Sequence, residues 1–484
     1  MFKCKFSVMI YMSSVKYLKK DSGGLFTGIF QGLAYVAPAA TAASFFVVEA
    51  GFVGASVPLT FILATLGVAS AMYMNYSFAK RISHAGGYYS YISAGLGGRL
   101  GGFGALLYYT NVLGALVGFS TLFFAGVTWP LIPQLASNPY GWIPLAFIPL
   151  VLIFTLLYFG LKPSLYYTLI GGIIEVTVLV AFSLFIILSP STHNSFVPFT
   201  LDGNTAGSLG FGTLYAVLGF VGLGSIITIS EELHTPKKVV PKAIIYGLII
   251  GAVVYIISSY AMVVGWGIQN IGSFSTSTNP GFTVMFNYLG PIGVTIFILI
   301  TLNSFISNGI AEGNAFSRIG FGMARDNLLL PKSMAVADKK TGSPRKIVLF
   351  EASFVTILSL ISGLLFGPFI GAAVVTTLNG VVLYVVHILA NISLPVYGKQ
   401  KMKLDFKKWL PFLLGPIPAT AIYLFAIYGS FTPIPAYPLS ISLYLFIIML
   451  VAGILFIIYL TLRRTPEEIR KIGSVEAIEE HEGN

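Results

Sequence analysis

The chain has 484 residues, of which 56% are hydrophobic and only 9% are charged, and its formal net charge is +11. A mean hydropathy of +0.86 and repeated apolar stretches of about 20 residues, enough to cross roughly 30 Å of hydrocarbon, exclude a soluble multidomain protein. A single cysteine, Cys4, excludes a disulfide framework. Because the sequence contains no phosphate-binding loop, metal-ligand spacing or nucleophile elbow, we expect neither an enzyme nor a bound cofactor or metal.

The first residues, MFKCKFSVMIYM, are apolar but too short and too basic to form a spanning helix. No small-residue cleavage site precedes the first long apolar stretch, so a signal peptide is not expected either. Met9 and Met12 are alternatives to Met1 as the start of translation.

Twelve apolar segments follow, and each is expected to span a membrane as a helix. They are residues 25–48, 56–79, 102–126, 143–160, 165–188, 209–229, 243–266, 291–316, 346–366, 370–394, 409–429 and 440–461. With the N-terminal segment 1–24 placed in the cytoplasm, all 28 Lys and Arg fall on the cytoplasmic side, including those of the tail 462–484. This segregation follows the positive-inside rule. The net charge therefore indicates topology in a plasma membrane, with both termini cytoplasmic and anionic lipids as neighbours, and does not indicate binding to nucleic acid.

Two of the twelve segments carry residues that interrupt a helix. The first contains LAYVAPAATAA, in which Pro38 removes a backbone donor and clashes with the preceding turn. The sixth contains Gly219, Gly222 and Gly224, and each glycine disfavours a helix by about 1 kcal/mol relative to alanine. A proline alone is often a harmless kink in a membrane helix, but here a second interruption follows five segments later.

Because five is an odd number, a second set of five helices enters the membrane from the opposite side. We therefore expect an inverted repeat of residues 25–188 and 209–394, followed by two further helices in 409–461. Interrupted segments at matching positions point to a transport site near the middle of the bilayer. Since half-helix ends carry partial charges, a substrate carboxylate is expected against free N–H groups at 34–39, and its ammonium against carbonyl groups freed at 219–222.

The fifth segment carries Glu175 near its middle, in LIGGIIEVTVLVAF. A carboxylate at this depth is costly and usually functional. No Lys or Arg lies at a comparable depth, so burial favours the protonated form and makes Glu175 a candidate proton carrier. Two alternatives stay open: a protonated Glu175 with a purely structural hydrogen bond to a backbone carbonyl, and a cation-binding Glu175.

Other polar side chains inside the apolar segments are candidates for the lining of a cavity. They are Tyr108, Tyr109, Thr110 and Asn111 in the third segment, Thr301, Asn303, Ser304, Ser307, Asn308 and Glu312 in the eighth, and Asn379, Tyr384, His387 and Asn391 in the tenth. The three- and four-residue spacing in the eighth segment places a polar stripe on one helix face, which either binds neighbouring helices or lines a wet cavity. Glu312 lies low enough to meet Arg318 or cytoplasmic water. In the uncharged segment 267–290, FTVMFNYLG is expected to form a short lid helix.

Three motifs carry a family resemblance. The first, AGGYYSY at residues 85–91, predicts an interfacial elbow between the second and third segments. The second comprises Phe220, Gly222, Glu231, Glu232, Pro236, Pro241 and Ala243, and the third comprises Ser317, Arg318, Met323, Ala324, Arg325, Asp326, Leu330, Pro331 and Pro344. In order and spacing, across about residues 25–400, they resemble the amino acid–polyamine–organocation superfamily. The chain departs from the family pattern at His84 (usually proline), Gly224 (often glutamate) and Asn327 (usually glycine).

The resemblance implies an all-α polytopic membrane protein with the five-plus-five inverted-repeat fold of the sodium/leucine-transporter type, in which helices one and six are broken. It places Leu218 and Phe220 near a gate, and the fifth segment beside the first, where sodium-coupled relatives hold an ion. The expected substrate-binding residues are Ala34, Tyr35, Val36, Ala37, Pro38, Ala39, Leu218, Gly219, Phe220, Gly222, Asn111, Ser304 and Asn308, with Glu175 for proton coupling.

These observations predict a secondary transporter that moves amino acids by alternating access, coupled to protons in preference to sodium. A site without membrane-embedded Arg or Lys favours zwitterionic substrates over polyamines and cationic amino acids. The alternatives are a carrier of related fold for a polyamine, nucleobase or metal ion, and an exchanger or sensor without ion coupling. Neither the particular amino acid nor the oligomeric state follows from the sequence.

Overall fold

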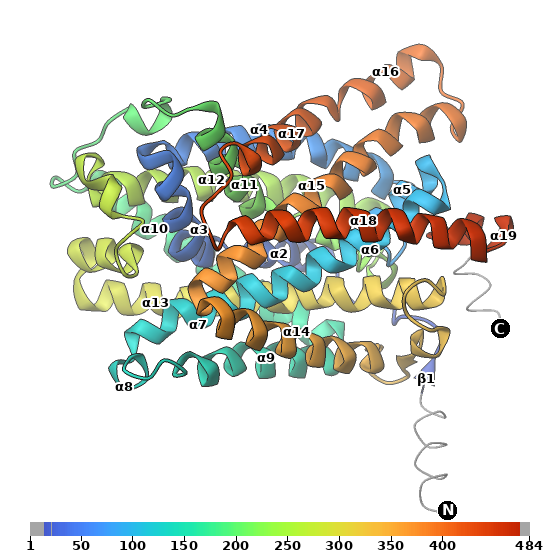
Figure 1. Ribbon diagram of the computed structural model, residues 1–484, viewed down its shortest axis with the longest axis horizontal. Coiled ribbons are helices and arrows are strands. Elements are labelled where there is room, and N and C mark those ends of the chain that lie inside the picture. Colours follow the sequence, from blue (N-terminus) through green and yellow to red (C-terminus); the bar gives the residue numbers. More distant parts are fainter. Residues whose placement is uncertain (1–13, 21, 475–484) are drawn as a thin grey trace, which may run out of the picture.

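The computed structural model describes residues 14–20 and 22–474, and over these ranges the chain is a bundle of helices (Figure 1). The two short strands of the described part, β1 (Ser14–Val15) and β2 (Ala337–Asp338), pair antiparallel. Cys4, the three candidate start residues Met1, Met9 and Met12, and the last ten residues of the tail lie outside the described ranges.

The α-helices of the described residues have the following bounds. They are α2 (Leu25–Val36), α3 (Pro38–Val53), α4 (Val57–Ala79), α5 (Tyr88–Leu96), α6 (Gly98–Ala115), α7 (Phe124–Thr128), α8 (Pro133–Ala136), α9 (Trp142–Tyr158), α10 (Leu161–Leu188), α11 (Ala206–Phe220), α12 (Pro236–Trp266), α13 (Pro280–Arg325), α14 (Arg345–Phe366), α15 (Pro368–Gln400), α16 (Phe406–Leu414), α17 (Ile417–Phe431), α18 (Ser440–Arg463) and α19 (Pro466–Lys471).

Within the described residues, nine helical stretches are long and apolar enough to cross a membrane, so the chain is a multi-pass membrane protein. One of the nine, Leu25–Ala79, contains both the first and the second predicted span. The fourth and sixth predicted spans correspond to two shorter apolar helices, α9 and α11. Each of the twelve predicted segments is thus largely helical, while the number of crossings stays a prediction.

The chain leaves the helical conformation at both places where proline and glycine predicted it. Between α2 and α3, Ala37 adopts a left-handed conformation with φ 49° and ψ 66°. The α11 helix ends at Phe220, Val221 is extended, and Gly222 has φ 111°. The sixth span was expected to continue to residue 229; instead, short 3-10 turns at Ser225–Ile227 and Ser230–Glu232 complete the segment.

Three local features interrupt the regular helices: a short elbow helix, a kink and a π segment. The elbow predicted after the second span is the short helix α5. The predicted lid helix is the first part of α13, which Gly290 separates from the rest by a kink with φ 65°. In the third span the helix widens to π geometry at Leu116–Phe123, a feature often found at functional sites, which the sequence did not predict.

The loops gather at two ends of the bundle (Figure 1). At one end β1 pairs with β2, and Arg464 Nη2 donates to the backbone oxygen of Asn327 at 2.6 Å. At the other end Asn204 Nδ2 donates to Val53 O at 2.9 Å. The first group consists of segments predicted to be cytoplasmic and the second of segments predicted to be external. The sorting of the loops into two sets therefore agrees with the segregation of basic residues.

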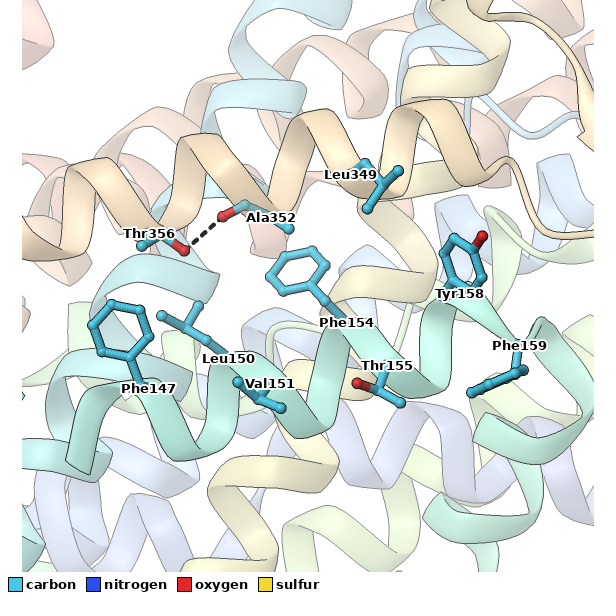
Figure 2. A pocket seen from close by; sticks show the side chains of 10 residues that line it. All are labelled: Phe147, Leu150, Val151, Phe154, Thr155, Tyr158, Phe159, Leu349, Ala352 and Thr356. Atoms are coloured by element: carbon cyan, nitrogen blue, oxygen red, sulfur yellow. Dashed lines mark hydrogen bonds between the residues drawn. The ribbon is translucent and has the colours of Figure 1, made fainter. Parts of the chain in front are cut away.

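Helices α9 and α14 lie side by side at the edge of the bundle and leave an apolar groove between them (Figure 2). Phe147, Leu150, Val151, Phe154, Thr155, Tyr158, Phe159, Leu349, Ala352 and Thr356 line it. The groove is open on its outer side, where Val151 and Leu349 are 61% and 58% exposed. Apolar side chains on the outside of a membrane bundle face lipid tails, so this groove is a lipid-facing surface.

Candidate functional site

The interior site is built around the break between α2 and α3. Ala37 closes α2 by donating its N–H to Leu33 O at 3.0 Å. Pro38 then occupies the first position of α3, where a missing N–H costs nothing because that group has no partner within the helix. The local sequence thus ends one helix and starts the next at the same point, and it leaves the first N–H groups of α3 to be satisfied by other parts of the chain.

Two helices distant in sequence satisfy those groups. Ala39 N donates to Glu175 Oε1 of α10 at 2.9 Å, and Ala40 N donates to Ser304 Oγ of α13 at 3.1 Å. Ser304 Oγ in turn donates to Glu175 Oε1 at 2.6 Å. The expectation of free N–H groups for a substrate carboxylate is therefore wrong for Ala39, because a backbone N–H is a single donor and this one is engaged. Ala40, just beyond the predicted range, is engaged as well.

The break after α11 lies directly against the first break. A Cβ on Gly222 would lie 2.0 Å from Tyr35 Cδ1, so only glycine allows the two segments to approach so closely, and its positive φ excludes other residues independently. Tyr255 of α12 joins the two breaks: its Oη lies 2.5 Å from Val36 O and 2.8 Å from Gly219 O.

Carbonyl groups at this second break also have partners within the chain. Leu218 O accepts from Val221 N at 3.0 Å, and Gly222 O accepts from Ser225 N at 2.8 Å. Each carbonyl oxygen keeps a second lone pair. They are therefore not free acceptors, and the contact between an ammonium group and the carbonyls at 219–222 stays a prediction.

The polar stripe of α13 holds both halves of the broken first span. Ser304 contacts the start of α3, as described above, and Asn308 Nδ2 donates to Tyr35 O near the end of α2. One turn further on, Ala311 O accepts from Gln31 Nε2 at 3.0 Å. The stripe both binds its neighbours and lines a cavity, the two roles that the sequence left open.

A small cavity lies between the two breaks. It is lined by Tyr35, Val36, Thr41, Phe45, Ala115, Phe119, Leu218, Val221, Asn308, Glu312, Thr376 and Asn379. Its free volume is about 20 Å³, whereas small-molecule pockets generally measure roughly 300–1,000 Å³. The structure therefore describes a contracted cavity, which must widen to hold a solute.

Four of the predicted binding residues line this cavity: Tyr35, Val36, Leu218 and Asn308. The others lie behind its wall or beside it. Ala34, Ala37, Pro38 and Ala39 form the first break, Gly219, Phe220 and Gly222 form the second, and Ser304 fastens α3. Asn111 donates its Nδ2 to Asn379 O at 3.0 Å and so supports a lining residue.

Other lining residues were not predicted as binding residues. Thr41 lies on α3 one turn after Pro38. Phe119 lies within the π segment of the third span, and Ala115 directly precedes that segment. Thr376 and Asn379 lie one turn apart on α15. Asn379 was among the candidates for the lining, whereas Thr376 was not. The aromatic residues gave no signal, because phenylalanine is common throughout the apolar segments.

Glu312 lines the cavity, as its place in the polar stripe allowed, but its predicted partner is wrong. It accepts a hydrogen bond from Ser120 Oγ at 3.0 Å and lines the cavity. Arg318, its expected partner, instead binds Glu232 through two hydrogen bonds of 2.9 and 3.0 Å, and both side chains are buried. The prediction that Glu312 meets Arg318 or cytoplasmic water is therefore wrong.

An aromatic cluster closes the cavity toward a larger pocket at one end of the bundle. Phe45 packs edge-on against Phe119 and Phe123, at 4.8 and 6.0 Å between ring centroids, and Phe123 packs against Phe369 at 5.0 Å. Phe45 and Phe119 line the cavity, and Phe369 lines the larger pocket of about 440 Å³. The four rings therefore separate the two spaces.

The opposite end is held by an ionic cluster around the elbow. Arg325 binds Glu231 at 3.0 Å, Glu231 Oε1 accepts from Ala85 N at 2.7 Å, and His84 Nε2 lies 2.9 Å from Arg325 Nη2. Burial and the adjacent guanidinium lower the pKa of His84 to about 3, so this imidazole is neutral. Burial raises the pKa of Asp326 to about 6, although it accepts hydrogen bonds from Tyr89 Oη and Gly473 N.

Comparison with known proteins agrees with the motifs. A family model described as "Amino acid permease" matches residues 27–471. The chain is 24% identical over 304 residues to the serine/threonine exchanger SteT of Bacillus subtilis, which covers 58% of this chain and 63% of that protein. It is 24% identical over 323 residues to the branched-chain amino acid permease BcaP of the same organism, covering 60% and 64%.

A third relative from Bacillus subtilis, a methylthioribose transporter, is 26% identical over 295 residues, which is 57% of this chain and 61% of that protein. The chain thus spans less than two thirds of the length of each of these relatives. They are exchangers, permeases and transporters, not enzymes. Since the family model covers nearly the whole chain, the protein belongs to the amino acid permease family.

Proposed function

We propose that this protein is a secondary transporter that moves an amino acid across the plasma membrane by alternating access. The observation that carries the proposal is the contracted cavity between the two helix breaks, closed by the aromatic cluster of Phe45, Phe119, Phe123 and Phe369 at one end. A buried polar cavity between broken helices is what alternating access requires, and two relatives are a serine/threonine exchanger and a branched-chain amino acid permease.

In this proposal the substrate widens the cavity lined by Tyr35, Leu218 and Asn308. Opening at one end separates the aromatic cluster, and opening at the other breaks the ionic cluster around Arg325. The halves of the first span are fastened by different residues: α13 holds α3 through Ser304 and α2 through Asn308, and Glu175 of α10 holds α3 in addition. They can therefore be released separately.

Coupling to protons is assigned to Glu175. Its Oε1 accepts from Ala39 N and from Ser304, while Oε2 is buried without a hydrogen-bond partner. The charged form is favoured at the positive end of α3, and the protonated form is favoured by burial of Oε2. The strength with which α3 is held then depends on the proton, which links proton binding to the movement of the helix. Sodium coupling and a purely structural Glu175 are the competing outcomes.

The proposal also includes the topology of the chain and its partners. The chain has twelve spanning helices in a five-plus-five inverted repeat of residues 25–188 and 209–394, two further helices in 409–461, and cytoplasmic segments 1–24 and 462–484. No cofactor or metal takes part. Anionic lipids surround the basic loops, and nucleic acid is not a partner.

A screen of ligand binding tests the function directly. Purified protein is heated in the presence of each of the twenty amino acids, since a ligand that binds the folded state raises its stability. We expect stabilisation by a small set of amino acids, each of which is then taken up by proteoliposomes. Stabilisation only by a polyamine, nucleobase, metal ion or methylthio-sugar would overturn the amino acid assignment, and flux without accumulation under any ion gradient would identify an exchanger or sensor.

A further inference from the structure

The cavity between the breaks contains a carboxylate without a cation. Glu312 is 2% exposed, lines the cavity, and accepts one hydrogen bond from Ser120 Oγ. None of the described side chains that line the cavity is Lys, Arg or His. Arg318, further along the same helix, is already neutralised by Glu232. An ionised carboxylate buried in this way requires either a bound cation or a proton.

Some of the donors in the cavity wall are engaged by other groups of the chain. Asn308 uses one N–H of Nδ2 to bind Tyr35 O, and its Oδ1 lies 2.6 Å from Ser120 Oγ, so Asn308 and Glu312 compete for the single hydroxyl proton of Ser120. The hydroxyl of Thr41 donates to Val36 O at 3.3 Å, and that of Thr376 donates to Ala372 O at 2.8 Å. Glu312 is the one carboxyl group among the described lining residues, so a cationic group complements this wall better than a carboxylate does.

A substrate carboxylate finds little of what it needs here. The N–H groups at the start of α3, its predicted partners, are bound to Glu175 and Ser304 on the side of the helix that faces α10 and α13. Thr41 and Phe45 are the α3 residues that line the cavity. The site therefore supports recognition of an amine better than recognition of a carboxylate.

We propose that Glu312 binds the cationic amine of the transported solute and that this amine, more than any carboxylate, is the group required for recognition. The inference rests on the proposed function and adds to it the chemical class of the ligand: an amine-bearing solute whose ammonium group lies between α13 and the π segment of the third span. It revises the sequence-based preference for zwitterions, because the buried acid that a cationic solute needs is present.

The test compares three ligands on purified protein: an amino acid that stabilises the wild type, its amide, which keeps the amine but lacks the carboxylate, and its 2-hydroxy acid, which lacks the amine. Affinities are measured by calorimetry. We expect the amide to bind within about tenfold of the amino acid and the hydroxy acid to bind at least about thirtyfold more weakly, since loss of one partner of a buried charge pair has effects of this size or more.

The variant Glu312→Gln should lose at least about thirtyfold in affinity for the amino acid and for the amide. Glu351→Gln is the matched control: Glu351 is also a buried acid, but it accepts from Tyr109 Oη at 3.1 Å and does not line the cavity. This control should bind as the wild type does. Glu312→Asp keeps the charge and should retain the preference for the amide over the hydroxy acid, so it supplies the test if Glu312→Gln does not fold.

Equal binding of the hydroxy acid and the amide by the wild type would overturn the inference. Unchanged affinity in Glu312→Gln would do so as well, and if that variant had also lost pH-driven accumulation, Glu312 would be a proton carrier instead. If the wild type bound no amino acid, the proposed function would fail, and titration with simple alkylamines would still decide whether Glu312 binds an amine.

Discussion

Substitution of Glu175 separates its role in coupling from its role in holding α3. In Glu175→Gln the amide oxygen can keep the two hydrogen bonds that Oε1 accepts, from Ala39 N at 2.9 Å and from Ser304 Oγ at 2.6 Å. The variant loses only the attraction between a negative charge and the start of the helix, about 0.3–1 kcal/mol. We therefore expect it to fold and to bind and exchange substrate, but to lose accumulation driven by a pH gradient, because no proton can be released.

Glu175→Ala removes the acceptor itself and should behave differently. It leaves the Ala39 N–H and the Ser304 hydroxyl without their partner, and each buried unpaired group costs about 1–3 kcal/mol, or roughly 2–6 kcal/mol together. Heating of the purified variants should therefore show Ala well below Gln in stability, and Glu351→Gln, a buried acid on α14, serves as the control.

The assay is uptake into proteoliposomes under an imposed pH gradient and, separately, under a sodium gradient. Full pH-driven accumulation by Glu175→Gln would refute the coupling role and leave Glu175 as a structural cap of α3. Loss of binding in the same variant would show instead that the negative charge is needed to shape the site.

Three further predictions follow from the same structure. Gly222→Leu should abolish substrate binding, because its side chain would occupy the position of the Tyr35 ring, whereas Gly272→Leu, with no heavy atom within 4 Å of its Cβ, should bind normally; equal affinities would place the site elsewhere. In a background without Cys4, a cysteine at Gly272 should react with an impermeant label from outside and one at Lys340 should not, and the reverse would invert the topology. Because the folded-state pKa of His84 is about 3 and lies below the ordinary 6.5, the unfolded state binds the extra proton, so stability is retained above pH 6.5 and lost as the pH falls toward 3. Between pH 6.5 and 5, the free energy of unfolding should fall by roughly 2 kcal/mol less in His84→Asn than in the wild type, as measured by unfolding at both pH values. An equal fall in both proteins would show that His84 does not contribute.

Local backbone chemistry is what the sequence by itself determined. Pro38 cannot donate a backbone hydrogen bond, and Gly222 tolerates a positive φ, so both breaks were predictable without knowing any neighbour. The elbow at α5, the short helix before Gly290 and the sorting of basic loops to one end follow from similarly local rules. A buried Glu175 in the middle of a span could likewise be identified as exceptional from composition alone.

Tertiary structure decided which groups meet. The N–H groups of Ala39 and Ala40 are bound because α10 and α13 bring Glu175 and Ser304 to them from more than a hundred residues away. In the same way, Glu312 faces the cavity with Ser120 while Arg318 turns to Glu232. A hydrogen bond depends on positions within a few tenths of an ångström, and these are fixed by the packing of whole helices, which the spacing of residues along one helix does not specify.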